Sequence, residues 1–211
     1  MNVITYPARP TEKIPGMRAG HLRECLALID ELTPTVARAV RERCPEQHLD
    51  AIAEAPRLAW VPLDYGLELA NAYHHVLGER ATFNWGRTLM VRTTSRPWLR
   101  TTRDTAVRLF GLTPKGLYRF ATQFYDAVYC HCGEAQCLVR DDGAVTIVLH
   151  GMPKPMLAAQ AHLISVAGVI AGAFDFCRVR GDVSMHPILT GDHGCAFDAI
   201  WAERRTAAGA R

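Results

Sequence analysis

Residue types that bind metal ions gather in one part of the chain, between positions 130 and 150. Cys130, Cys132 and Cys137 lie within eight residues, and His150 follows across a predicted hairpin. Together these four could surround a tetrahedral zinc ion. However, the spacing is not that of a zinc knuckle, and in a strand His131 would point away from the two cysteines beside it. Free cysteines also pack in cores as small apolar residues. We therefore interpret the cluster as core packing and keep a zinc site as the alternative.

Histidines at two other places in the sequence could also take part in chemistry. His74 and His75 follow Tyr73 in a predicted helix, where adjacent side chains diverge by about 100° and only one of them can enter a pocket. His162 is different, because it stands in a helix that is otherwise almost wholly apolar. Such a histidine either makes a hydrogen bond inside the core or projects into a ligand cavity. Both interpretations remain open from the sequence.

Signatures of nucleophilic catalysis and of phosphate binding are absent from the sequence. There is no G-x-S-x-G elbow and no glycine-rich phosphate loop. The seven cysteines are an odd number and no signal peptide precedes them, so a secreted disulfide scaffold is not expected and a reducing cytoplasm fits best. A metal-dependent enzyme or a thiol redox switch is thus the least favoured function.

Basic residues are concentrated between Arg87 and Arg119, where eight of them stand against one acidic residue, Asp104. This run is either a solvated surface or a surface that meets an acidic partner or phosphate groups, with Arg96, Arg100 and Arg103 as its contact residues. The whole chain carries a formal charge of +3. That charge is too small to indicate nucleic acid as a partner.

The segment Met156–Phe176 is the most apolar part of the chain, with no charged residue before Asp175. Gly168 and Gly172 stand four residues apart, so one face of a helix here would be nearly bare backbone. The segment has about the minimum length for crossing a bilayer. Because it contains polar residues such as Gln160, we predict a buried core helix and no membrane span.

Hydrophobic periodicity and turn signals place the other elements around this helix. An aspartate-glycine pair at Asp142-Gly143 between two apolar runs predicts a hairpin. We expect the glycine face of the uncharged helix to press onto one antiparallel sheet formed by two hairpins. The predicted helices span 17–32, 33–44, 46–55, 64–77, 100–110, 113–129 and 156–176, with 80–94 helical or irregular, and the predicted strands span 129–140, 144–150, 177–185 and 195–203.

The fold class expected from this order is α+β. One domain covers residues 17–203, with a helical half at 17–128 and a sheet-plus-helix half at 129–203. An extended arm, 1–16, precedes it, and a flexible tail, 204–211, follows. At this length one core can form without disulfides or metals.

The C-terminal motif Gly191, Asp192, Cys195 and Phe197 resembles the end of four-vinyl-reductase-type domains. Those domains share a fold with heme-nitric-oxide-binding domains and with the Bet-three-type subunits of the TRAPP tethering complex, in which helices cover an antiparallel sheet with an apolar pocket between them. Over about residues 18–203 the chain also resembles a myxobacterial paralogous family of unassigned function. That resemblance rests on the run from Trp60 to Tyr65, on Gly86-Arg87 and on the strand, uncharged helix, strand ending.

Two departures limit what the resemblance implies. Ile188 stands where the four-vinyl-reductase-type pattern has a further cysteine, which counts against a zinc or cysteine-pair role there. The Tyr-x-Ser-x-Arg signature of the heme-binding relatives is missing, so heme is disfavoured and no cofactor is expected. The resemblance still implies a pocket, whose wall we expect to include Trp60, Tyr65, Tyr73, Trp85, Phe120 and Phe124, with His162 as the polar contact.

The function that these features favour is a non-enzymatic, cytoplasmic ligand-binding or sensory module with an apolar pocket for a small molecule. The alternative is a homodimeric interaction scaffold that uses the basic surface between Arg87 and Arg119.

Overall fold

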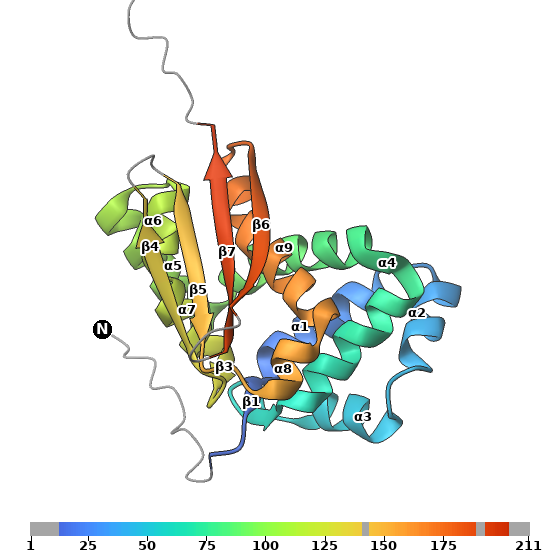
Figure 1. The fold of residues 1–211 in the computed structure, drawn as a ribbon. Helices are drawn as coiled ribbons and strands as arrows, with labels where there is room; N and C mark the ends of the chain where they lie inside the picture. Colours follow the sequence, from blue (N-terminus) through green and yellow to red (C-terminus); the bar gives the residue numbers. More distant parts are fainter. Residues whose placement is uncertain (1–12, 141–143, 189–192, 203–211) are drawn as a thin grey trace, which may run out of the picture.

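A computed structural model describes residues 13–140, 144–188 and 193–202 (Figure 1). Most of the predicted arm, the tail, the Asp141-Asp142-Gly143 turn and the Gly191-Asp192 motif lie outside these described residues. The elements follow in the order β1 (Gly16–Arg18), α1 (Ala19–Asp30), α2 (Pro34–Arg41), α3 (Glu46–Glu54), β2 (Trp60–Pro62), α4 (Leu63–Thr94), α5 (Pro97–Phe110), α6 (Pro114–Tyr118), α7 (Ala121–Val128), β3 (Tyr129–Cys130), β4 (Glu134–Val139), β5 (Val145–His150), α8 (Lys154–Ala158), α9 (Gln160–Cys177), β6 (Gly181–Ile188) and β7 (Gly194–Trp201).

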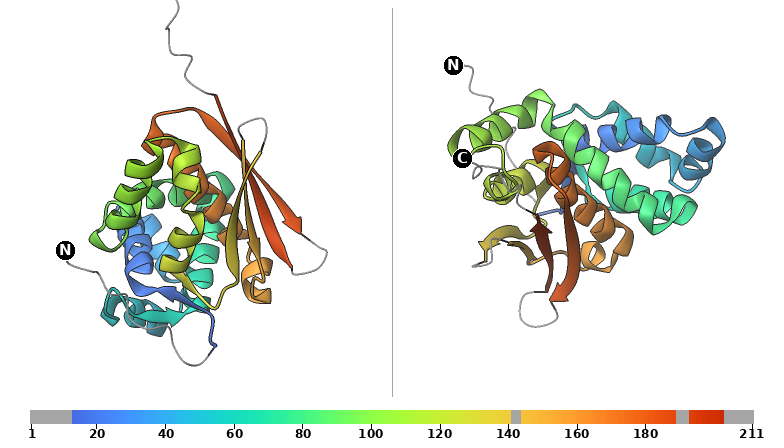
Figure 2. Two further views of the ribbon diagram at one scale, coloured as in Figure 1. Left: turned by 90° about the vertical axis from the view of Figure 1, so that its left-hand side faces the viewer. Right: turned by 90° about the horizontal axis from the view of Figure 1, so that it is seen from above.

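The main sheet is antiparallel, with strand order β4-β5-β7-β6. Along β5, for example, buried side chains alternate with half-buried ones, as expected for a sheet with one face in the core. Ile147 opposes Phe197, and Leu149 opposes Cys195; all four side chains are buried. Helices α6, α7 and α9 contact this sheet and lie on one side of it, so the fold is α+β as predicted (Figure 2).

A second sheet, β2-β1-β3, joins segments that are far apart in the sequence. Met17 pairs with Val61 on one side and with Tyr129 on the other. The next residue, Arg18, is 1% exposed, donates hydrogen bonds to the carbonyl oxygens of Leu58 and Ala127, and places its guanidinium 3.5 Å from the ring centre of Trp60. This buried arginine, at the end of β1, ties the start of α1 to the segment before β2 and to the end of α7.

The predicted strand 129–140 is wrong in one respect, because the chain turns sharply in its middle. His131 and Gly133 have φ of 54° and 88°. This left-handed backbone ends β3 in the small sheet and starts β4 in the main sheet.

Several helix boundaries also differ from the prediction, among them the start of the helix predicted for 17–32, where Met17 and Arg18 belong to β1. Gly78, predicted to end a helix, is instead a kink with φ 81° inside α4, which continues to Thr94. The helix predicted for 113–129 breaks between α6 and α7, and the one predicted for 156–176 breaks between α8 and α9 at Ala159. At the Gly78 kink the Thr82 hydroxyl donates to the Gly78 carbonyl oxygen at 2.9 Å.

The glycines of α9 contact α4, and the prediction that they face the sheet is wrong. A Cβ atom on Gly168 would lie 2.0 Å from the carbonyl oxygen of Phe83, and one on Gly172 would lie 2.7 Å from that of Arg87. The contact is reciprocal, since a Cβ on Gly86 of α4 would lie 2.0 Å from the carbonyl oxygen of Ser165. The two helices therefore cross backbone to backbone.

Helix α9 is long and apolar enough to cross a membrane by length and composition alone. In the fold, 72% of it is buried by the rest of the protein. Burial in the core thus accounts for its apolar sequence.

Candidate functional site

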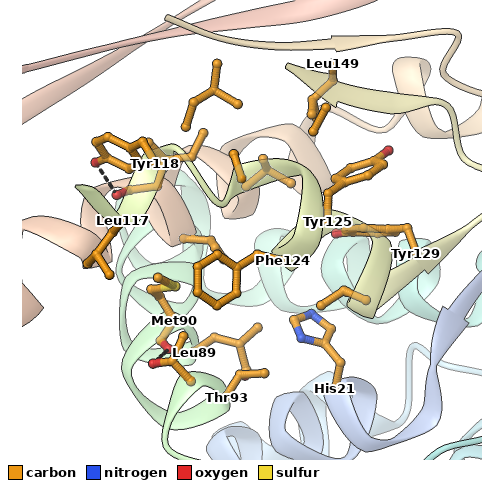
Figure 3. A pocket seen from close by; sticks show the side chains of 18 residues that line it. His21, Leu89, Met90, Thr93, Leu117, Tyr118, Phe124, Tyr125, Tyr129 and Leu149 are labelled. Carbon is orange, nitrogen blue, oxygen red and sulfur yellow. Dashed lines mark hydrogen bonds between the residues drawn. The ribbon is translucent and has the colours of Figure 1, made fainter. Parts of the chain in front are cut away.

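A cavity of about 120 Å³ lies where α1, α4, α6, α7 and α9 meet the inner face of the main sheet (Figure 3). Buried residues such as Leu89 and Ile147 form its floor, whereas the half-buried Met90, Phe124 and Val166 stand toward the solvent. The cavity thus lies between the helices and the main sheet.

Helical spacing explains how three helices each present a stripe to this cavity. Helix α7 contributes Ala121, Phe124, Tyr125 and Val128, which lie three or four residues apart and share one face. Leu89 and Thr93 of α4 have the same i, i+4 relation, as do Val166 and Ile170 of α9. The wall is therefore built from elements that must all pack together before the cavity exists.

Most polar atoms of the wall already have partners inside the protein. The Tyr118 hydroxyl donates to the carbonyl oxygen of Ile170 at 2.8 Å, and the Tyr125 hydroxyl donates to that of Cys132 at 2.8 Å. The Tyr129 hydroxyl lies 3.3 Å from Nε2 of His162. The Thr94 hydroxyl donates to the carbonyl oxygen of Met90 at 2.7 Å. Because the hydroxyl protons of Tyr118, Tyr125 and Thr94 are already donated, a ligand could not accept a hydrogen bond from these groups without breaking an existing bond.

Two polar atoms of the wall have no partner among the residues that the structure describes. Nδ1 of His21, on α1, and Oγ1 of Thr93, on α4, are buried without a hydrogen bond, and the two residues are 7% and 3% exposed. Both residues line the cavity, and Figure 3 labels both of them below the ring of Phe124. Because an unpaired buried polar atom costs about 1–3 kcal/mol, this pair needs a physical explanation.

The wall carries no net charge near neutral pH. Burial lowers the pKa of His21 to about 4, so its ring is neutral. Burial also raises the pKa values of Tyr118, Tyr125 and Tyr129, which keeps these phenols protonated. No aspartate, glutamate, lysine or arginine is among the described residues that line the cavity.

Of the residues proposed for the wall from the sequence, Phe124 lines the cavity. Tyr73 and Trp85 stack on each other with ring centres 4.6 Å apart, and Trp60 lies under Arg18. Tyr65 stacks on His48, and Phe120 packs half-buried against the core. His162 is 4% exposed, is not among the residues that line the cavity, and lies with its Nε2 3.3 Å from the hydroxyl of Tyr129, which does line it.

His21 is the residue that sequence reasoning missed. It stands on the apolar stripe of α1, four residues before Cys25 and seven before Leu28, and all three are buried. A histidine in register with such a stripe is a signal for a buried imidazole. Nothing in the local sequence indicates that Thr93 lies near it.

The basic residues proposed as an anion surface mostly have acidic partners. Arg96 pairs with Glu24 at 2.6 Å, and Arg100 and Arg103 both contact Asp104. In addition, Arg87 binds Asp175 through two hydrogen bonds, and Arg92 pairs with Glu31. These ion pairs reduce the free positive charge of the surface, and its role as an interface stays a prediction.

The cysteine cluster also has structural partners in the fold. The Cys132 thiol lies 3.6 Å from the carbonyl oxygen of Gly16, and burial raises its pKa to about 12. Burial likewise raises the pKa of Cys137. Among the described residues no three histidine, cysteine, aspartate or glutamate side chains are placed to hold a metal ion. Protonated, mostly buried thiols are also poor nucleophiles, which counts against a thiol redox switch.

A serine, a histidine and an aspartate meet on the outward face of the main sheet. Ser184 Oγ lies 3.2 Å from His186 Nε2, and Asp198 Oδ2 lies 3.4 Å from the same nitrogen. In a hydrolase triad the carboxylate binds the other ring nitrogen. This exposed cluster therefore does not have the arrangement of a catalytic triad.

No protein-family model matches the sequence, and no curated protein is significantly similar to it. Solved structures do match. A mutant H-NOX protein of K. algicida in the unliganded Fe(II) state aligns with a TM-score of 0.61 and 10% identity, over 90% of this chain and 98% of that one.

The chain has the fold of H-NOX proteins. An H-NOX protein of S. oneidensis in the Fe(II)NO state gives a TM-score of 0.57 at 10% identity, over 87% of this chain and 99% of that one. One of Shewanella woodyi in the Fe(II)CO state gives 0.51 at 13%, over 91% and 98%. Identities this low show the fold alone.

The pocket residues of this chain do not fit a heme. Cofactor sites usually enclose about 300–1,000 Å³, whereas this cavity measures about 120 Å³. The described wall also offers no arginine or lysine to pair with carboxylate groups of a porphyrin. His21 Nδ1 is a free ring nitrogen of the kind that can bind iron, but it faces too small a space. That the protein binds no heme stays a prediction.

Proposed function

We propose that this protein is a non-enzymatic, cytoplasmic sensory module that binds a small apolar molecule in the cavity between the helices and the main sheet. The observation that carries the proposal is an apolar cavity whose wall contains two buried polar atoms without partners, His21 Nδ1 and Thr93 Oγ1. Ligand pockets typically combine an apolar lining with a few convergent polar groups.

Two further observations support parts of this proposal. The wall offers His21 as its one imidazole and holds its tyrosines protonated, which suits binding better than acid-base chemistry. All seven cysteines are free, which agrees with a reducing compartment. A bound ligand would also contact several elements at once, because α1, α4, α7, α9 and the main sheet all border the cavity.

Native mass spectrometry of freshly purified protein tests the proposal, together with crystals pressurised with xenon, which enters apolar cavities. We expect a retained or exchangeable small molecule and a xenon site beside Val169. The variant Val169→Phe, which fills the cavity from α9, should lose both. A clean apo mass, with no xenon site and no binding of any small apolar molecule, would refute a ligand-binding role.

A further inference from the structure

The unpartnered polar atoms of the protein are not scattered at random. Among the described residues, four buried side-chain atoms lack a hydrogen-bond partner, and two of them, in His21 and Thr93, line one cavity. The other two are the indole nitrogens of Trp60 and Trp85, which lie outside its wall. A shared cavity offers both atoms a common partner that the protein itself does not contain.

The residues that line the cavity determine which charge a common partner of His21 Nδ1 and Thr93 Oγ1 can carry. The imidazole of His21 is neutral, and the described residues lining the cavity include no charged side chain. A carboxylate or an ammonium group would therefore lose its hydration without gaining a counter-ion, which is strongly unfavourable. A neutral group that both donates and accepts, such as a hydroxyl, matches one ring nitrogen and one threonine hydroxyl.

The size and the apolar part of the partner follow from the remaining wall. A dry cavity of about 150 Å³ lined by aliphatic and aromatic side chains can hold a benzene molecule, and this cavity of about 120 Å³ is close to that size. Phe124, Tyr118, Tyr125 and Tyr129 border it, and aromatic rings pack favourably against one another.

We propose that the ligand is a phenol, a single aromatic ring whose one hydroxyl group pairs with His21 Nδ1 and Thr93 Oγ1. This inference rests on the proposed ligand-binding function and names its ligand class. A single water molecule is the competing partner for the two atoms, because it too can both donate and accept.

Isothermal titration of the full chain with phenol, benzene and benzoate tests this assignment. Two neutral hydrogen bonds to otherwise unpaired atoms should make phenol bind about tenfold or more tighter than benzene, and benzoate should not bind. Thr93→Val removes one partner while keeping the branched shape. It should lower phenol affinity about tenfold and leave benzene affinity unchanged. His21→Phe keeps a ring but removes the nitrogen, and it should also lower the affinity for phenol.

Thr94→Val is the matched control, because Thr94 also lines the cavity but its hydroxyl already binds the Met90 carbonyl. It should leave the phenol-to-benzene ratio unchanged. Equal affinities for phenol and benzene, or equal effects of Thr93→Val and Thr94→Val, would overturn the phenol assignment while leaving an apolar ligand-binding function standing. If none of the three compounds binds and a crystal structure shows one water bridging His21 and Thr93, the phenol assignment fails. The ligand-binding function fails with it only if the retained small molecule and the xenon site are absent as well. Melting curves of each variant show whether it is folded.

Discussion

Replacing Gly168 by alanine is expected to separate α9 from α4 and to destabilise the protein severely. The new Cβ would lie 2.0 Å from the carbonyl oxygen of Phe83 and 3.0 Å from the amide nitrogen of Arg87, both backbone atoms. Moving the first contact out to even 3.0 Å requires a shift of 1.0 Å, the difference between the two distances. The interior of a protein is too closely packed to absorb such a shift locally.

The expected magnitude is the difference between two effects. Alanine is favoured over glycine inside a helix by about 1 kcal/mol. Overpacking typically costs about 1–3 kcal/mol, and because rigid backbone is the obstacle here we expect a cost of about 4 kcal/mol. We expect a net loss of about 3 kcal/mol in the free energy of unfolding. For a chain of this length that corresponds to a fall of roughly 6–12 °C in Tm.

Gly66→Ala is the matched control, since Gly66 is also buried in a helix, but its new Cβ would meet the flexible thioether of Met17 at 2.2 Å. Side-chain movement should relieve that contact at about 1 kcal/mol or less net cost, because the helix-propensity gain is the same. Urea denaturation followed by circular dichroism measures both variants. A Gly168→Ala variant as stable as Gly66→Ala would show that the α4–α9 crossing is not fixed by backbone contact.

Three other predictions concern charge and cofactor. The pKa of His21 and that of His162 are about 4 in the folded state, against 6.5 for a free histidine. Their contribution to the free energy of unfolding is therefore present above pH 6.5 and is lost as the pH falls toward 4, by up to about 3 kcal/mol each. Urea titrations at pH 7.5 and 4.5 should show this loss, and an undiminished loss in His21→Leu would contradict it. Arg96→Glu should lower the free energy of unfolding by about 2 kcal/mol, because the new carboxylate would face Glu24, which is 2% exposed. Arg100→Glu, at an exposed ion pair, should change the melting curve little. Equal melting curves for the two variants would refute a structural role of the ion pair between Arg96 and Glu24. Added hemin should produce no stoichiometric Soret band, and a band that disappears in His21→Ala would show that the cavity opens to hold the macrocycle.

The sheet and its buried face could be predicted because local patterns encode them. The predicted strand 195–203 corresponds to β7, in which alternation places Cys195, Phe197 and Ala199 together on the buried face, and the uncharged helix was recognised from its composition. The turn at His131 was missed because a left-handed residue interrupts a run whose apolar periodicity continues on both sides. Periodicity reports which face is buried and not whether the chain stays in one sheet.

The partner of the α9 glycines and the cavity itself escaped prediction for a common physical reason. Glycines four residues apart on a helix allow the close approach of another backbone, but a helix and a sheet both satisfy that requirement. Similarly, His21 and Thr93 are 72 positions apart, the difference of their numbers, and only the packing of α1 beside α4 brings them to one cavity. Seven aromatic or histidine positions were therefore proposed for the wall by composition, although only Phe124 lines it.

The crossing of α4 and α9 also explains how a cavity persists in an otherwise packed core. On α4, Leu89 and Thr93 follow Gly86 by about one and two helical turns, and on α9 Val166 and Ile170 stand on either side of Gly168 in the sequence. The residues of each helix that line the cavity therefore lie next to the crossing. Because the backbones already touch at the glycines, the helices cannot move closer to fill the space beside that contact. A void in a core normally shrinks by relaxation of its walls. Here the wall helices are held at a fixed distance, which leaves the unpaired atoms of His21 and Thr93 facing a space that a ligand can occupy.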